Sequence, residues 1–239
     1  MTIQSNTTLL QELLAEANAM PNADDVYNDG YNVGLEKGKQ AEYDAFWDAY
    51  QQNGNRTDYN MAFGGAGWTD ETFKPKYLIK PAKAEITFFG SMLTTIPDGI
   101  LDFSGVKNGY QTFRSGAFVT LPKIDISNCS EGTNMLLSYC PNLKKIKTLV
   151  VSEQTNFNAN AFNSLPSLED IEIEGTIAKS VSFWSVPLLT NESVQSIIDH
   201  LKDLTGATAQ TLTFHATVGN KLTQAQKDAI SAKNWTLVY

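Results

Sequence analysis

The sequence has few of the residues that carry most enzyme and metal chemistry. It contains only two cysteines and two histidines in 239 residues. Two cysteines exclude a disulfide-dense scaffold, and no cluster of cysteine, histidine and aspartate has the spacing of a zinc site. Nucleotide-binding, serine-nucleophile and metalloprotease motifs are absent too. We therefore expect no catalytic residue, no metal and no cofactor, and we expect Cys129 and Cys140 to be reduced core residues.

Charged residues and long apolar runs are also scarce. Charged side chains make up 18% of the chain, against a usual ~25%, and the formal net charge of −8 disfavours nucleic acid and anionic lipid as partners. No apolar run approaches the ~20 residues of a membrane span. The first residues lack the basic region and apolar core of a signal peptide. These absences predict a protein that is cytoplasmic until release, with no nucleic-acid partner and no membrane span.

The N-terminal quarter is predicted to be helical. A first segment, residues 1–22, contains an amphipathic pattern that Pro21 ends. This helix either packs on its own domain or forms a homo-oligomer, and the pattern favours neither, because short isolated helices are marginal in water. A stretch in the next segment imitates a calcium loop with Asp25, Asp29, Gly30 and Glu36. A tyrosine occupies the third loop position, where a ligand is required, so calcium binding is not expected.

Residues 23–80 form a helical lead segment that is rich in aromatic side chains. Phe46, Trp47 and Tyr50 share one face of a predicted helix. Aromatic side chains bury large areas and make dense small cores, and they also stack on sugars. We favour the core. The alternative is a carbohydrate-binding module in which Trp47 and Trp68 form an aromatic platform.

A repeated pattern occupies the middle of the chain. Residues 118–126, 137–146 and 162–171 each have an apolar residue four before a proline and another apolar or cysteine residue directly before it. Ile124, Ile146 and Ile171 follow these prolines and are spaced within the ~20–29 residues of leucine-rich repeats, although the first unit is shorter after its proline. The pattern predicts a leucine-rich-repeat solenoid over residues 81–189, with an earlier strand beginning at Ile86. Stacked units of this kind share a continuous core.

The C-terminal residues 190–239 predict a unit that closes the open end of that core. A helix opens at Asn191, a strand runs through Leu212 and Phe214, and Thr223 with Gln226 forms a capping box before a second helix. A last strand begins at Trp235. The predicted fold class is therefore α/β with an α+β lead: a solenoid with an N-terminal helical segment and a helix–strand C-terminal cap.

The repeated Phe-x-x-Leu-Pro-x-Leu-x-x-Ile pattern resembles the BspA-type leucine-rich repeats of bacterial proteins. The stretches 45–57 and 67–73 and the Asn-Trp-Thr near the C-terminus are similar to prophage-encoded repeat proteins of gut Firmicutes. This resemblance implies binding or particle structure on a phage tail or cell surface. It implies a virion- or cell-surface-associated protein after release, and it carries no catalytic motif.

We therefore predict a non-enzymatic binding or structural protein whose partner is a protein or cell-surface receptor, or a glycan on that surface. Contacts would come from an extended sheet face with neutral polar and aromatic side chains. The predicted binding residues are exposed strand positions: Thr87, Asp125, Lys147, Glu172, Glu174, Thr213 and His215. A less favoured alternative is a glycosidase-like enzyme with paired carboxylates, because carboxylates are ordinary exposed residues.

Overall fold

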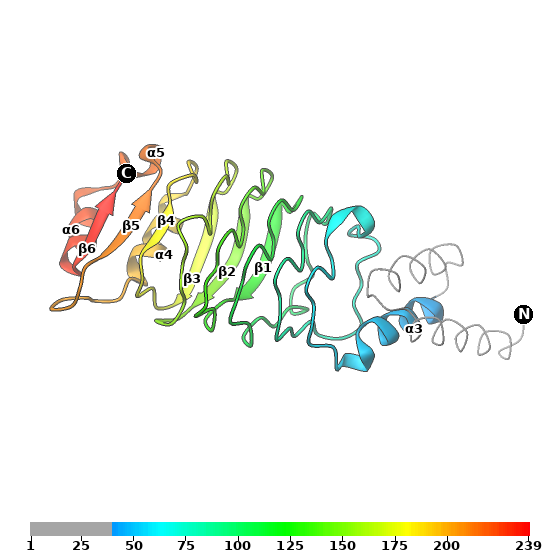
Figure 1. The fold of residues 1–239 in the computed structure, drawn as a ribbon. Coiled ribbons are helices and arrows are strands. Elements are labelled where there is room, and N and C mark those ends of the chain that lie inside the picture. Colours follow the sequence, from blue (N-terminus) through cyan, green and yellow to red (C-terminus); the bar gives the residue numbers. More distant parts are fainter. Residues whose placement is uncertain (1–39) are drawn as a thin grey trace, which may run out of the picture.

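The computed structural model describes residues 40–239. These residues form an elongated body in which successive chain segments lie side by side, from α3 at one end to α6 and β6 at the other (Figure 1). The elements are, in chain order, α3 (Gln40–Tyr50), the 3-10 helices η1 (Gln52–Gly54) and η2 (Gly65–Gly67), β1 (Thr120–Asp125), β2 (Lys145–Val151), β3 (Asp170–Gly175), β4 (Val181–Phe183), α4 (Asn191–Asp199), β5 (Gln210–Phe214), α5 (Ala216–Gly219), α6 (Gln224–Ala232) and β6 (Trp235–Val238). The predicted first helix and the calcium-like stretch lie outside the described residues.

The strands form two parallel three-stranded sheets, ordered β1-β2-β3 and β4-β5-β6. In the first sheet, Leu121 lies opposite Ile146 and Ile146 opposite Ile171. These apolar side chains point into the core, whereas Glu172 and Glu174 of β3 are exposed. Alternation of this kind is what period-two strand geometry requires when one face is buried. The first sheet therefore presents a charged outer face.

The predicted leucine-rich-repeat solenoid is wrong. Two separate sheets of three strands replace the single repeat sheet, and residues 81–119 hold turns and isolated bridges instead of strands. The expected strand at Ile86 is a turn, because Ile86 has a φ of 60°, which lies far from the extended region. The mixture of helices and parallel strands is the part of the fold class that the structure contains.

The pairing of the strands does not follow the three isoleucines throughout. Ile146 lies opposite Ile171, but Leu121, and not Ile124, lies opposite Ile146. Pro122 lies inside β1, between Leu121 and Lys123. Because β1 is the edge strand of its sheet, the missing N–H of a proline is tolerated there.

Turns stack on one another at residues 61–65, 86–90, 111–115, 135–139 and 159–164, and we call this feature the turn ladder. Phe63, Phe88 and Phe113 each donate a backbone N–H to the next segment, with N–O distances of 2.7–2.9 Å. Positive φ angles recur along the ladder, at Met61, Ile86, Gln111 and Met135 and then at Gly65, Gly90, Ser115, Tyr139 and Ser164. Left-handed backbone at non-glycine residues is costly, so the hydrogen bonds between segments stabilise it.

The core runs through the whole described body and changes in composition along it. Near α3 it is aromatic: the ring centroids of Trp47 and Trp68 lie 4.9 Å apart, and Phe88 stacks on Phe113 at 5.4 Å. In the sheets it is mainly isoleucine, leucine and valine. Both cysteines are free and buried, which confirms their predicted place in the core.

The C-terminal elements confirm several local predictions. Thr223 and Gln226 form a capping box at the start of α6, and Thr190 caps α4 through its side chain. Strands occur where the sequence predicted them, at β5 through Leu212 and Phe214 and at β6, which begins at Trp235. Within residues 40–239, every helix falls short of the length and apolarity that a bilayer crossing requires.

Candidate functional site

The first sheet ends at β3, and helix α4 takes the place of a fourth strand. The hydroxyl of Ser193 accepts the backbone N–H of Ile171 at 2.9 Å, and the hydroxyl of Ser196 accepts that of Ile173 at 2.9 Å. An uncovered sheet edge presents unpaired backbone groups that invite another strand. The two serines satisfy these donors, so the sheet edge is closed and β3 is held against α4.

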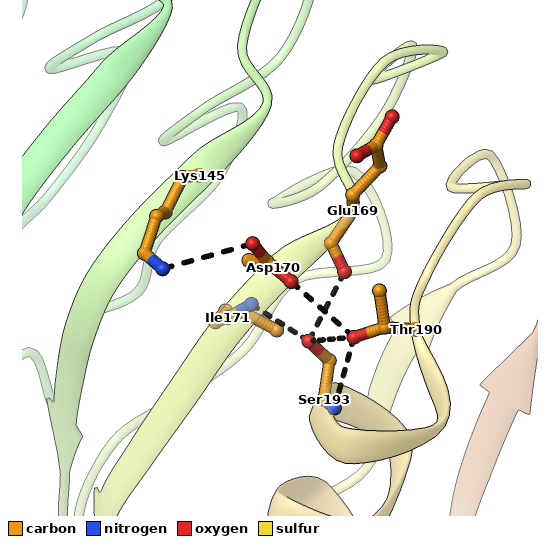
Figure 2. A network of polar contacts seen from close by, with 6 residues as sticks. All are labelled: Lys145, Glu169, Asp170, Ile171, Thr190 and Ser193. Atoms are coloured by element: carbon orange, nitrogen blue, oxygen red, sulfur yellow. Dashed lines mark hydrogen bonds and ion pairs between the residues drawn. The ribbon is translucent and has the colours of Figure 1, made fainter.

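Figure 2 shows how this corner is organised. Ser193 also donates its hydroxyl to the carbonyl of Glu169 at 3.0 Å, and its backbone N–H donates to Oγ1 of Thr190. Thr190 is thereby the N-cap of α4, a position that favours threonine because its oxygen satisfies a free N–H. Nζ of Lys145 lies 3.6 Å from Oδ2 of Asp170 across the strands. The N-terminus of α4, the edge of the sheet at β3 and the ion pair between Lys145 and Asp170 thus belong to one network of polar contacts.

A polar groove follows β2, β3 and the first turns of α4. It has a volume of about 510 Å³ and is lined by Lys145, Ile146, Lys147, Thr148, Asp170, Ile171, Glu172, Glu192, Ser193 and Ser196. This volume lies within the ~300–1,000 Å³ of ordinary ligand sites. Charged and hydroxyl side chains dominate the lining. Lys147 and Glu172 are among the binding residues that the sequence predicted, and the expected neutral polar and aromatic contacts stay a prediction.

Ion pairs neutralise most of the charges on this face. Nζ of Lys123 lies 2.6 Å from Oε2 of Glu174, which spans from β1 to β3, and Lys147 pairs with Asp98. Glu172 and Glu192 are exposed in the same groove, and neither forms an ion pair with any residue of the described part of the chain. The groove therefore offers two unneutralised carboxylates among paired charges.

The structure separates the predicted binding residues. Lys147, Glu172 and Glu174 lie on the charged outer face, and Asp125 is half-buried at the end of β1, where it accepts the N–H of Ser127. Thr213 lies in the other sheet, in β5, and His215 follows it as the N-cap of α5. The expected exposure of Thr87 is wrong, because this residue sits inside the turn ladder with no exposed surface.

The proposed aromatic platform is also placed in the core. Trp47 and Trp68 are 0% and 1% exposed, and their rings pack against Phe63 and Phe73. A sugar needs a ring face that is open to solvent in order to stack on it. These two tryptophans therefore hold the aromatic end of the body together and offer no platform.

Metal and thiol chemistry find no support in the described residues. Among residues 40–239, no group of three or more histidine, cysteine or acidic side chains is arranged to hold a metal ion. Burial raises the pKa of the Cys129 and Cys140 thiols to about 12, so both stay protonated at neutral pH. A protonated thiol is a poor nucleophile and a poor metal ligand.

Sequence reasoning missed most of the groove residues. Lys145, Glu192, Ser193 and Ser196 were not recognised as surface neighbours of Glu172, because α4 follows β3 by more than fifteen residues in the chain. The threonine three residues before Ser193 is a local signal for a helix start. No local signal reveals that the serines of this helix accept hydrogen bonds from a strand.

Comparisons with family models, curated proteins and solved structures found no match to this chain. They add no support to the resemblance to BspA-type repeats or prophage proteins, which stays a prediction from the sequence.

Proposed function

We propose that this chain is a non-enzymatic recognition protein that binds a partner protein on the charged outer face of sheet β1-β2-β3. The observation that carries the proposal is the pair of unneutralised carboxylates, Glu172 and Glu192, in a groove whose other charges are paired. Charge complementarity selects partners and guides their approach. We infer that the partner places a lysine or arginine side chain in this groove.

The rigid support of the groove favours binding. Lys145 and Asp170 hold the strands across from each other, and Ser193 and Ser196 fix α4 against β3. Binding surfaces lose less free energy on association when their side chains are already ordered. The glycosidase alternative receives less support, since Glu172 and Glu192 are both exposed, whereas a glycosidase needs one desolvated acid beside its ionised partner.

A site-specific photo-cross-linker tests the proposal in the cell that produces the protein. The cross-linking residue replaces Thr148, which lines the groove on the central strand. A matched variant carries it at Lys74, an exposed residue that does not line the groove. We expect one discrete protein adduct from Thr148 and none from Lys74. The same adduct from both positions, or no adduct from Thr148, contradicts the proposal.

A further inference from the structure

A second groove crosses four neighbouring chain segments, and prolines make up three of its seven lining residues. It has a volume of about 410 Å³, and its lining residues are Tyr139, Pro141, Ser164, Pro166, Ser185, Pro187 and His215. Hydrogen bonds link the segments in order: Tyr139 to Asn163, Leu165 to Ser185, and Thr217 to Pro187, at 2.8–3.2 Å. The groove therefore runs across the segments and not along one of them.

The sequence arranges this groove in two rows. Tyr139, Ser164 and Ser185 each stand two residues before a proline. The residues between them, Cys140, Leu165 and Val186, are fully buried. One row is consequently made of proline rings and the other of polar side chains, and His215 continues the polar row on the next segment.

Polar groups in this row are free to bind a ligand. Oγ of Ser185 accepts the N–H of Ser164 at 3.0 Å, which leaves its own hydroxyl hydrogen available. Nδ1 of His215 lies 2.8 Å from Oγ1 of Thr217, which leaves Nε2 available. Tyr139 is 44% exposed, so its ring and hydroxyl are open to a ligand.

An arginine without a carboxylate partner lies at the Tyr139 end of the groove. The guanidinium of Arg114 is 5.3 Å from the Tyr139 ring centroid and 5.6 Å from that of Phe89. Its buried Nε atom has no hydrogen-bond partner, and none of the ion pairs among residues 40–239 includes it. Stacking on aromatic rings holds this cation in place, where it can accept an anionic group of a ligand.

We propose that this groove binds an extended, proline-rich peptide in the polyproline II conformation, with an acidic residue at the Arg114 end. Hydrogen-bonded neighbouring segments lie about 4.8 Å apart, so two steps along the groove cover about 9.6 Å. One polyproline II turn of three residues covers about 9.3 Å. The same face of the peptide therefore meets every second chain segment of the groove. The backbone carbonyls of the peptide form no hydrogen bonds within a polyproline II helix, so they can accept hydrogen bonds from the polar row.

The length of the site follows from the same spacing. Four steps lead from the segment of Arg114 to that of His215, about 19 Å in all, which about six polyproline II residues span. The aspartate of such a peptide would lie against Arg114, and its prolines would lie against Tyr139 and the proline row. This peptide site shares no lining residue with the polar groove on β2, β3 and α4, which we call the charged groove.

Fluorescence anisotropy with the full chain tests the proposal. The probes are fluorescein-labelled Asp-Pro-Pro-Ala-Pro-Pro, the same peptide with lysine in place of aspartate, and one with alanine in place of every proline. We expect the first peptide to bind at least about tenfold more tightly than either of the others. Equal affinity for the three peptides, or no saturable binding of the first, overturns the proposal.

Variants locate the site on the protein. Tyr139→Ala is expected to weaken binding about tenfold, as truncation of a central aromatic contact does. Arg114→Gln should remove the preference for aspartate over lysine while the affinity for prolines persists. Met92→Ala, at an exposed apolar residue outside the groove, should bind like the unaltered chain.

A further variant separates this inference from the proposed protein partner. Glu172→Lys with Glu192→Lys changes only the charged groove and should leave peptide affinity unchanged. Loss of peptide binding in this double variant, or undiminished binding in both Tyr139→Ala and Arg114→Gln, contradicts a peptide site at Tyr139. Circular dichroism of each variant verifies that it is folded.

Discussion

The two halves of the described body stack their segments in the same way but with different side chains. Residues 40–118 pack aromatic rings and connect their segments through turns, whereas residues 119–239 pack mainly aliphatic side chains and form sheets. Alternating β-branched residues favour strands in β2 and β3. In the turn ladder, residues with positive φ cannot adopt the extended backbone of a strand. Hydrogen bonds between segments therefore occur in both halves, but flat sheet surface occurs only in one.

This difference places the candidate sites. The charged face needs strands, because only strands put every second side chain on one outer surface. The groove lined by Tyr139 and the three prolines depends on turns. Its polar row begins in the turn ladder, at Tyr139 and Ser164, and continues just after β4 and β5. Both grooves are lined by residues of the aliphatic half.

The largest expected effect is the loss of a ring from the aromatic half. Phe88 packs against Phe63, Phe73 and Phe113 with centroid distances of 5.1–5.9 Å. Phe88→Ala should lower the free energy of unfolding by about 3–5 kcal/mol, and Ile171→Val in the sheet by about 0.5–1.5 kcal/mol. Urea denaturation measures both. Equal losses would contradict the view that ring packing stabilises this half.

Glycine substitutions distinguish the sheet from the turns. A Cβ on Gly175, at the end of β3, would lie 2.0 Å from the carbonyl oxygen of Val151, and its φ is +100°. The same atom on Gly90, with φ +65°, meets nothing closer than 3.9 Å. Gly175→Ala should cost about 2–4 kcal/mol through clash and strain, and Gly90→Ala about 1–2 kcal/mol through strain alone.

Thermal denaturation followed by circular dichroism compares the two variants. A smaller shift in melting temperature for Gly175→Ala than for Gly90→Ala would show that the contact between β2 and β3 is looser than described.

The edge serine has a smaller expected effect. Ser193→Ala leaves the buried N–H of Ile171 without its acceptor and should cost about 1–3 kcal/mol. Ser231→Ala, at an exposed position of α6, is the matched control and should change stability by less than about 0.5 kcal/mol. Hydrogen exchange should accelerate at the Ile171 amide in the first variant only. Unchanged exchange there would show that α4 does not close the sheet edge.

The smallest expected effect is on the thiols. Burial raises the pKa of Cys129 and Cys140 to about 12 from an ordinary value of 9.0, so neither should react with a thiol reagent at pH 8 until urea unfolds the chain. Above about pH 9 the unfolded state loses thiol protons that the folded state keeps, so stability should fall as pH rises. Rapid labelling of the folded protein would contradict the burial of both residues.

Local signals predicted the parts of the fold that depend on local chemistry. The capping box at Thr223 and the alternation of Ile171 and Ile173 were sufficient for α6 and β3. Ile86 and Phe88 favour strands by propensity, yet hydrogen bonds to a segment about 24 residues away hold Ile86 at positive φ. Long-range contacts override local preference there, which is why the solenoid prediction failed.

The candidate sites were only partly predictable for the same reason. Period-two alternation correctly predicted that Glu172 and Glu174 are exposed. Glu192 and Ser193 line the same groove as Glu172, but they belong to α4. This helix comes after both β3 and β4 in the chain, so no local pattern places it beside Glu172. The repeated proline was visible in the sequence, but its role as one wall of a groove depends on stacking between segments.

Cross-linking from Thr148 in two charge variants tests whether the unpaired carboxylates of the groove hold the partner protein. Glu172→Lys with Glu192→Lys reverses the two unpaired carboxylates, whereas Lys123→Glu with Glu174→Lys exchanges the members of an ion pair and keeps the net charge. We expect the first variant to lose at least about nine-tenths of the adduct, because like charges would then meet in the interface. We expect the second to keep the adduct. Equal yields from the two variants would contradict recognition through the charged groove.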